Sequence, residues 1–374
     1  MIIGYEAKRL FQNYSGLGNY SRNTVNIMAR FFPENKYVLF APQLTTLYKC
    51  PECVEAVLPE TKLSKRFSGL WRIFIRRRTL RKNKIDVFHG LSNGFPVGVG
   101  RSGVPSVVTI HDLIFLRYPK FYKKIDQMIY HFFMANSCRH ATKIIAISQQ
   151  TKRDLVEILG VDAEKIEVVY QSCNKLFYER VEETIKARVR HKYSLPDQFI
   201  LTVGTIERRK NQLAILEGLV KENLDIPLLV LGKPTAYKMV LDEFIMDNDI
   251  RKQVIFLHQT TTEELQAIYQ MAGIMVYPSF FEGFGLPVLE AQASGCPVIT
   301  SNISSLPEAG GDGAVYIDPA NSDEIGKSIR RILTDQKLKE ELIQKGKANA
   351  QLFSDQAVAE ELMRLYQSIV AAHN

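Results

Sequence analysis

The sequence lacks three features that mark membrane-spanning, secreted and disulfide-stapled proteins. No apolar run approaches the ~20 residues that a helix needs to cross a bilayer. The first ten residues, MIIGYEAKRL, do not show the basic and then apolar pattern of a signal peptide. The five cysteines are odd in number and scattered, and Cys50 and Cys53 form a lone C-x-x-C motif without a second pair. We therefore expect a cytoplasmic protein whose cysteines are unremarkable thiols.

Internal repeats and low-complexity tracts are also absent, and acidic residues are scarce in one half of the chain. The 374 residues, 46% hydrophobic and 24% charged, suit a soluble protein with two domains. Residues 1–171 contain 26 Lys and Arg against 13 Asp and Glu, whereas the remainder contains 22 against 27. This asymmetry predicts that the first half meets an anionic surface or substrate.

The basic charge is concentrated in residues 61–84, which contain ten Lys and Arg and no acid. Apolar residues recur there at helical spacing, at Leu63, Phe67, Leu70, Trp71, Phe74 and Ile75. One interpretation is a crossover helix that packs on a sheet and leaves its basic side in water. The other is a peripheral contact with anionic membrane or a lipid-diphosphate acceptor, stabilised by about 1 kcal/mol per basic residue. The two interpretations are compatible, and we expect both.

Short buried strands alternate with helical segments along the whole chain, which predicts an α/β fold with two doubly wound parallel sheets. We expect strands at 2–5, 36–41, 85–89, 105–110, 143–147, 166–169, 198–204, 228–231, 254–257, 273–279 and 297–300. The predicted domains are 1–171 together with 356–374, because the last helix is expected to cross back, and 172–355.

The stretch EGFGLPVLE, from Glu282 to Glu290, is the most informative one. It follows a strand, and its glycines Gly283 and Gly285 would let backbone N–H groups of Phe284 and Leu286 approach a ligand. A helix beginning near Leu286 would present its positive end to an anion. The carboxylates of Glu282 and Glu290 would accept hydrogen bonds from hydroxyls. Hydroxyls together with a phosphate describe a sugar nucleotide.

Three further places have the residue types of such a site. Gly16 and Gly18 lie in a loop expected to lead into a helix. His111 and Asp112 follow a predicted strand, at an end that faces the ligand crevice of an α/β sheet. Arg209 and Lys210 lie where a loop becomes a helix, and two cations there need an anion such as a diphosphate.

These stretches resemble a known family. The run SFFEGFGLPVLEAQASGCPVI, with seven residues between Glu282 and Glu290, is similar to the signature of family 4 retaining glycosyltransferases of the GT-B fold. VGTIERRKN resembles the phosphate loop of that family, although Arg208 replaces a common proline and Thr205 stands where some relatives have arginine. VTIHDLIFLRYP resembles mannosyltransferase-like members.

The resemblance implies two Rossmann-like domains facing across a cleft and a role for each candidate residue. His111, Arg209, Lys210 and Glu282 would be catalytic, and Glu290 would bind the ribose. The other donor-binding residues implied are Gly16, Gly18, Asp112, Thr205, His258, Gly283, Phe284, Gly285 and Leu286. The nucleotide sugar, favoured as GDP-mannose, would be a substrate, with no cofactor and no metal.

The motif Asp247-Asn248-Asp249 matches a metal-binding string of another glycosyltransferase fold, but we interpret it as a polar turn between a helix and a strand. The expected acceptor is a glycan or a lipid-linked glycan in the synthesis of a cell-surface polysaccharide such as lipopolysaccharide. The location would then be the cytoplasm, at the inner face of the membrane.

Other functions stay open at this point. UDP- or ADP-sugars would make the protein a glucosyl- or galactosyltransferase, and a GT-B sugar-nucleotide epimerase or phosphorylase is a rival enzyme. A catalytically silent scaffold of the same fold would need disrupted site residues, whereas Glu282, Glu290, Lys210 and His111 are intact. A basic nucleic-acid-binding protein would explain only residues 61–84, so we expect no nucleic-acid partner.

Overall fold

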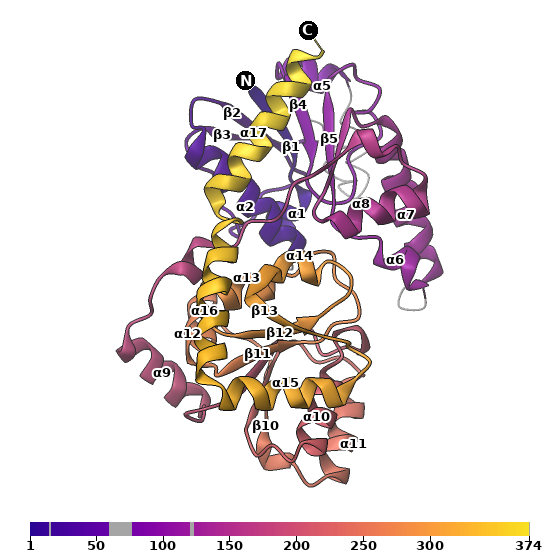
Figure 1. Cartoon of the computed structure of the whole chain (residues 1–374). Helices are drawn as coiled ribbons and strands as arrows, with labels where there is room; N and C mark the ends of the chain where they lie inside the picture. Colours follow the sequence, from indigo (N-terminus) through magenta and orange to yellow (C-terminus); the bar gives the residue numbers. More distant parts are fainter. Residues whose placement is uncertain (15, 60–76, 120–122, 374) are drawn as a thin grey trace. The chain divides into compact units, whose positions relative to one another are not determined.

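The structure is a computed structural model that describes residues 1–14, 16–59, 77–119 and 123–373. Contacts divide the chain into two compact units (Figure 1). The first unit comprises residues 1–171 and 355–374, and the second comprises residues 172–354. Each unit contains its own parallel sheet, so the predicted α/β class is confirmed.

The sheet of the first unit, within the described residues, has seven parallel strands in the order β3-β2-β1-β4-β5-β6-β7. β4 and β5 are buried along their whole length, and β1, β2 and β6 are buried at all but their first residue, as expected when helices cover both faces. The strands are β1 (Ile2–Glu6), β2 (Lys36–Phe40), β3 (Val54–Val57), β4 (Val87–Gly90), β5 (Ser106–Ile110), β6 (Lys143–Ala146) and β7 (Ile166–Val168).

Helices cover both faces of this sheet. Tyr37 and Leu39 of β2 belong to one apolar cluster, whereas Val38 and Phe40 belong to the cluster on the opposite face. The helices of the unit are α1 (Lys8–Gln12), α2 (Gly16–Phe31), α5 (Arg77–Lys82), α6 (Ile114–Arg117), α7 (Lys124–His140), α8 (Gln149–Leu159) and α17 (Asp355–Ala371). Of the basic stretch 61–84, only α5 and the residues after it belong to the described part of the chain.

Helix α17 is the last element of the chain, yet it packs on α2 and on β4 of the first unit (Figure 1). Its Tyr366 is fully buried, and the hydroxyl lies 2.6 Å from Nδ1 of His89. The other ring nitrogen of His89 lies 2.7 Å from the hydroxyl of Thr109. A buried polar chain therefore joins the C-terminal helix to the middle of the sheet.

The sheet of the second unit runs in the order β10-β9-β8-β11-β12-β13 among the described residues. The order reverses between β8 and β11, which are neighbours although three helices separate them in the chain. Ligands of such sheets bind outside the carboxyl ends of the strands at this reversal. The strands are β8 (Ile200–Val203), β9 (Leu228–Leu231), β10 (Val254–Leu257), β11 (Ile274–Tyr277), β12 (Val298–Ser301) and β13 (Ala314–Ile317).

In the second unit one helix precedes the first strand, and the others lie between consecutive strands or at the end of the unit. They are α9 (Glu183–Tyr193), α10 (Gln212–Lys221), α11 (Lys238–Asp247), α12 (Thr262–Met271), α13 (Leu286–Ala293), α14 (Leu306–Gly310), α15 (Ser322–Thr334) and α16 (Gln336–Gln351). In the described part of the chain, no helix combines the length and the apolarity needed to span a membrane.

Four α-helices or strands in the described part of the chain, namely α1, α6, β3 and α12, were not predicted from the sequence. The last of these carries a readable signal, because Thr261 and Glu264 form a reciprocal capping box at its start. Asp247 ends α11, and Asp249 follows in a turn with φ of 53° before β10. This string therefore lies between a helix and the amino end of a strand, where the sequence analysis placed it.

Candidate functional site

The loop between β11 and α13 lies at the carboxyl end of β11, beside the reversal in the strand order. Helix α13 begins at Leu286 with Pro287 in its first turn, as predicted. The turn between β8 and α10 lies at the neighbouring strand end and contains a short 3-10 helix, Arg208–Lys210. The two segments that carry the predicted signature therefore meet at one edge of the sheet.

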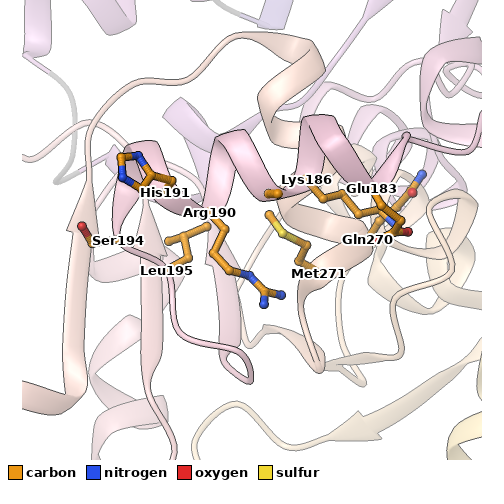
Figure 2. A pocket seen from close by; sticks show the side chains of 9 residues that line it. Glu183, Lys186, Arg190, His191, Ser194, Leu195, Gln270 and Met271 are labelled. Atoms are coloured by element: carbon orange, nitrogen blue, oxygen red, sulfur yellow. The ribbon is translucent and has the colours of Figure 1, made fainter.

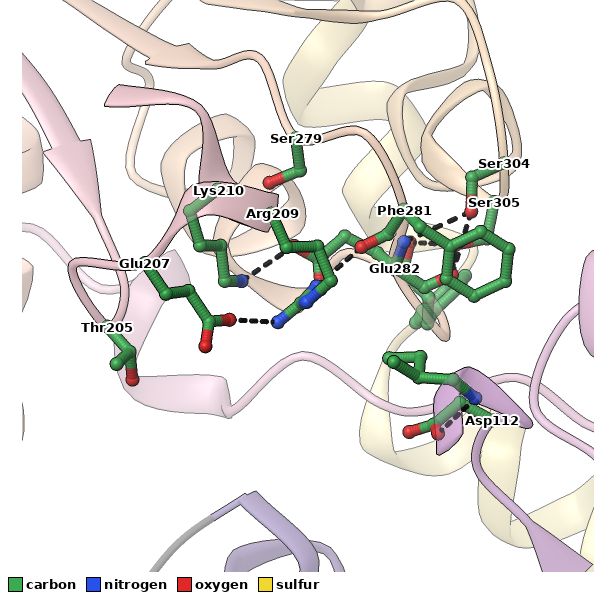
Figure 3. A network of polar contacts seen from close by, with 12 residues as sticks. Asp112, Thr205, Glu207, Arg209, Lys210, Ser279, Phe281, Glu282, Ser304 and Ser305 are labelled. Carbon is green, nitrogen blue, oxygen red and sulfur yellow. Dashed lines mark hydrogen bonds and ion pairs between the residues drawn. The ribbon is translucent and has the colours of Figure 1, made fainter. Parts of the chain in front are cut away.

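Glu282 joins the two segments, because its carboxylate pairs with both cations of the turn (Figure 3). Its Oε1 lies 2.6 Å from Nζ of Lys210, and its Oε2 lies 2.9 Å from Nη1 of Arg209. The Tyr277 hydroxyl donates to the same Oε1 at 3.1 Å and also contacts the Lys210 ammonium. Glu207 accepts a bond from the other arm of Arg209 at 2.6 Å.

These charges hold one another in the ionised state. Burial alone would raise the pKa of Glu282, but Lys210 and Arg209 more than offset it, and the pKa falls to about 2. Burial would lower the pKa of Arg209, but the carboxylates of Glu282 and Glu207 keep it raised. Burial lowers the pKa of Lys210, with Glu282 opposing the shift. Two carboxylates and two cations therefore form a compact cluster without net charge.

The backbone of the turn is fixed as firmly as its side chains. Asn211 adopts the left-handed conformation, with φ of 58°, and its amide donates to the carbonyls of Pro278 and Pro319 at 3.2 and 2.7 Å. The carbonyl of Arg209 accepts from the N–H of Phe280 at 2.9 Å. The turn after β8 is therefore bound to the loop after β11 through side-chain and backbone hydrogen bonds.

Two serines fix the other side of the Glu282 loop. The Ser304 hydroxyl accepts from the N–H of Glu282 at 3.1 Å, and the Ser305 hydroxyl lies 2.9 and 2.6 Å from the carbonyls of Glu282 and Phe284. Helix α14 follows these serines, but neither hydroxyl caps it, because both bind the Glu282 loop.

The glycines of the loop differ in what they do. Gly285 has φ of 145°, and a Cβ there would lie 2.9 Å from Cβ of Ala309. Its missing side chain therefore permits close packing of α13 on α14, which is a structural reason that the sequence analysis did not give. Phe284 is buried and its ring faces Phe353, whereas Gly283 and Leu286 are partly exposed. Contact of these residues with a donor stays a prediction.

Glu290 lies about one turn into α13, as predicted. Its Oε2 accepts a hydrogen bond from the hydroxyl of Tyr269 at 3.1 Å. Removal from water raises the pKa of Glu290 to about 7, and the bond from Tyr269 opposes this shift only in part. The two glutamates of the signature thus differ, because the pKa of Glu282 is lowered by its cations whereas the pKa of Glu290 is raised by burial.

Thr205 and His258 also lie at carboxyl ends of strands. Thr205 follows β8, is partly exposed, and its carbonyl accepts from the side chain of Gln212 at 3.0 Å. His258 is exposed and follows β10, the edge strand of the sheet. Nothing in their surroundings tests the predicted contacts with the donor.

In the first unit, His111 and Asp112 follow β5 as predicted. His111 is only 4% exposed, and its Nε2 lies 2.9 Å from the carbonyl of Leu91. Its ring is perpendicular to that of Tyr20, with 4.6 Å between the centroids. Asp112 accepts the N–H of Ile114 at 3.0 Å. The carboxylate thus orders the start of α6.

The prediction of a glycine loop at Gly16 and Gly18 was wrong in its geometry. Helix α2 already begins at Gly16, so both glycines lie in its first turn. A Cβ at Gly18 would lie 1.9 Å from the carbonyl oxygen of Asn13, so the residue serves the close packing of the chain after α1. Gly16 has open space around it.

An open hollow lies away from these segments, between α9 and the end of α12 (Figure 2). Its cations are already paired, since Lys186 binds Glu183 at 3.0 Å and Arg190 binds Asp197. None of the predicted site residues lines it. It therefore carries no chemistry of its own.

Sequence reasoning missed several residues that complete the site. Tyr277, at the end of β11, and Glu207, two residues before Arg209, both bind members of the charged cluster. Ser304 and Ser305 bind the Glu282 loop from 22 and 21 residues further along the chain. Gln171, whose amide contacts His111, was not recognised at all. The contact could not be read from a local sequence pattern, because 60 residues separate Gln171 from His111.

Comparison with known families identifies two matching stretches. The model described as "Glycosyl transferases group 1" matches residues 184–349, and the model described as "Glycosyltransferase Family 4" matches residues 23–174. The two stretches contain most of both units.

Curated relatives include enzymes of O-antigen synthesis. The O-antigen chain mannosyltransferase RfbU of Salmonella typhimurium is 29% identical over 225 residues, 60% of each chain. The O-antigen chain mannosyltransferase B of Escherichia coli is 28% identical over 293 residues, 77% of this chain and 76% of the relative. The E. coli mannosyltransferase WbdA is 30% identical over 282 residues, 72% of this chain but only 34% of the relative.

Solved structures share the fold over nearly the whole chain. Anabaena HepE, in complex with UDP and glucose, has a TM-score of 0.78 and 16% identity, with 98% of this chain and 100% of that chain covered. WaaG, a glycosyltransferase involved in lipopolysaccharide biosynthesis, has a TM-score of 0.70 and 15% identity, with 98% and 99% covered.

The substitution Gly285→Ala tests whether the loop depends on the packing of α13 against α14. The positive φ and the short distance to Ala309 should lower the free energy of unfolding by more than about 1 kcal/mol. Chemical denaturation measures the loss. The control is Gly273→Ala, where the nearest atom to the new Cβ is 3.5 Å away. Equal stability of the two variants would contradict the packing role.

Proposed function

We propose that this chain, which belongs to the group 1 glycosyltransferases and has the GT-B fold, transfers a hexose with retention of configuration from a nucleoside-diphosphate sugar to a glycan or lipid-linked acceptor. The favoured donor is GDP-mannose, and the setting is cell-surface polysaccharide synthesis. The observation that carries the proposal is the pairing of Arg209 and Lys210 with Glu282, eight residues before Glu290. Similarity to O-antigen mannosyltransferases supports the choice of mannose.

In the free protein the two carboxylates of the cluster balance its two cations. The site proposed for a diphosphate therefore does not bury a net charge before the ligand binds. The side chains of Arg209 and Lys210 are 15% and 12% exposed, so phosphate oxygens can reach them. When these oxygens take over bonds to the cations, Glu282 releases an oxygen that can accept a sugar hydroxyl. Glu290 would accept ribose hydroxyls, which favour its ionised form.

The chemical step needs charge stabilisation more than a nucleophile. The bond between C1 of the hexose and the diphosphate oxygen breaks, and its electron pair leaves with the diphosphate. The acceptor hydroxyl oxygen bonds to C1 from the same face, and its proton passes to the departing phosphate. Arg209, Lys210 and the N–H groups at the start of α13 stabilise the charge that develops, without a metal ion.

A comparison of nucleotides tests the proposal directly. GDP should raise the melting temperature more than UDP or ADP, and GDP-mannose should be turned over in EDTA as fast as with Mg²⁺. NMR of the product should show the anomeric configuration of the donor. A larger shift with UDP would select the glucosyl- or galactosyltransferase alternative. No shift with any nucleoside diphosphate would contradict the proposed function.

The substitution Lys210→Ala removes one of the two donors to the diphosphate. The loss of a preorganised charge at the leaving group should lower kcat by about 10²-fold or more. Initial rates of GDP-mannose turnover measure the effect. Lys252→Ala is the matched control, because Lys252 is an exposed lysine of the same unit that does not belong to the charged cluster. An unchanged kcat in Lys210→Ala would remove the main support for the mechanism.

We also propose that the first unit contacts anionic membrane. The basic stretch 61–84 lies mostly outside the described residues, but α7 provides a second basis. Its side chains Ile125, Met128, Ile129 and Phe132 are 69%, 70%, 49% and 59% exposed and follow helical spacing. Lys123 and Lys124 lie at the start of this apolar stripe. Apolar insertion beside cations suits an anionic bilayer, and would hold the enzyme at the inner face of the cytoplasmic membrane.

Liposome sedimentation tests the membrane contact. Vesicles with anionic lipid should bind the protein and release it as salt rises, and Met128→Ser should weaken the binding. Met239→Ser is the control, because Met239 is 73% exposed but belongs to the second unit. Equal binding to neutral vesicles would contradict the electrostatic part, and equal loss in both variants would contradict the role of α7.

A further inference from the structure

The state of the His111 ring follows from its two hydrogen-bond partners. The carbonyl of Leu91, 2.9 Å from Nε2, can only accept, so Nε2 carries a proton. In the neutral ring Nδ1 is then an acceptor. The side-chain nitrogen of Gln171 lies 3.1 Å from Nδ1 and donates to it. Both ring nitrogens are therefore occupied by groups of the protein, and the tautomer is defined.

The surroundings of His111 favour this neutral form. His111 is 4% and Gln171 is 8% exposed, so the bond between them is shielded from water. Burial lowers the pKa of His111 to about 4, and the nearby Arg9 on α1 acts in the same direction. Three other titratable groups lie near the ring. Tyr20 on α2 is in ring contact with it, and Asp112 is the next residue in the chain. A positive charge on His89 of β4 would oppose a positive charge on His111.

Gln171 is held in place from both sides in the chain. Two residues earlier, the N–H of Val169 still bonds to the carbonyl of Ala146 beside the sheet. Two residues later, the N–H of Cys173 bonds to the carbonyl of Phe353, and both of these belong to the second unit. Gln171 is thus the last residue of the first unit before the chain enters the second unit. Backbone bonds two residues before and two residues after Gln171 therefore restrict its main chain.

We propose that Gln171 is a positioning residue that donates to Nδ1 of His111 in the free protein and so keeps the ring neutral, with Nδ1 ready to accept a hydrogen bond from a hydroxyl of the donor sugar. This inference rests on the proposed function. The sugar hydroxyl would replace the Gln171 amide, which is chemically equivalent as a donor. A protonated ring has no lone pair on Nδ1, so it could not accept either bond.

Two substitutions separate this role from a merely structural one. Gln171→Glu keeps the shape but replaces a donor with a carboxylate, which should raise the pKa of His111 by about 1–3 units. Gln171→Leu removes the donor without adding charge, so the shift should have the same sign and be smaller. Gln43→Glu is the control for charge, because Gln43 is exposed in the same unit.

The first readout does not need any substrate. NMR of the full chain labelled with ¹⁵N-histidine, with His111→Asn to assign the signal, reports tautomer and charge. We expect the Nε2–H tautomer, neutral from pH 6 to 8, in the wild type and in Gln43→Glu. A wild-type ring with its proton on Nδ1, or a titration unchanged in Gln171→Glu, would overturn the inference. Circular dichroism establishes that each variant is folded.

The second readout is the pH profile of GDP-mannose turnover. Because protonation disables Nδ1, Gln171→Glu should lose on the order of 10-fold in kcat/KM for each pH unit below its raised pKa. The wild type and Gln43→Glu, in which only the titration of Glu290 remains, should share one profile, so the effect is measured as the ratio of Gln171→Glu to wild type at each pH. Parallel profiles with a shifted NMR titration would overturn the contact with the sugar. Absence of turnover in all proteins would instead refute the proposed function, while the NMR result still decides the tautomer.

Discussion

The pairing of Glu282 with Arg209 and Lys210 is the interaction on which the site of the second unit depends. A buried carboxylate or cation without a partner is strongly destabilising, so neither the loop after β11 nor the turn after β8 could take its present position alone. The surrounding bonds strengthen this constraint, since Asn211 binds the carbonyl of Pro278 and Ser305 binds that of Glu282. The charged cluster therefore organises backbone as well as side chains.

The neutrality of the cluster has a consequence for ligand binding. A site with two unpaired cations would attract any phosphate, but it would also be costly to bury in the free protein. Here Glu282 and Glu207 balance Arg209 and Lys210, so an incoming diphosphate exchanges partners with a carboxylate. Such an exchange couples phosphate binding to the release of a Glu282 oxygen. Under the proposed function, the same glutamate then meets the sugar.

Local patterns in the sequence were sufficient for most of the fold. The strands β9 and β10 and the start of α13 were predicted at their observed residues, because short apolar runs, glycines and a first-turn proline are local signals. The placement of Glu282 on a loop and Glu290 on a helix was predictable for the same reason. Contacts between distant residues were not. That Ser305 binds the Glu282 loop, or that Gly18 packs against Asn13, depends on tertiary structure.

Both units use the same physical device at their candidate residues. In the second unit, a carboxylate occupies the cations that would bind phosphate, and in the first, an amide occupies the imidazole nitrogen that would bind a hydroxyl. Each internal partner offers the same kind of bond as the proposed ligand, carboxylate oxygen for phosphate oxygen and amide N–H for hydroxyl. The buried polar groups therefore have hydrogen-bond partners in the free protein. A ligand that offers the same kind of bond exchanges one partner for another, and no buried group is left without a hydrogen bond.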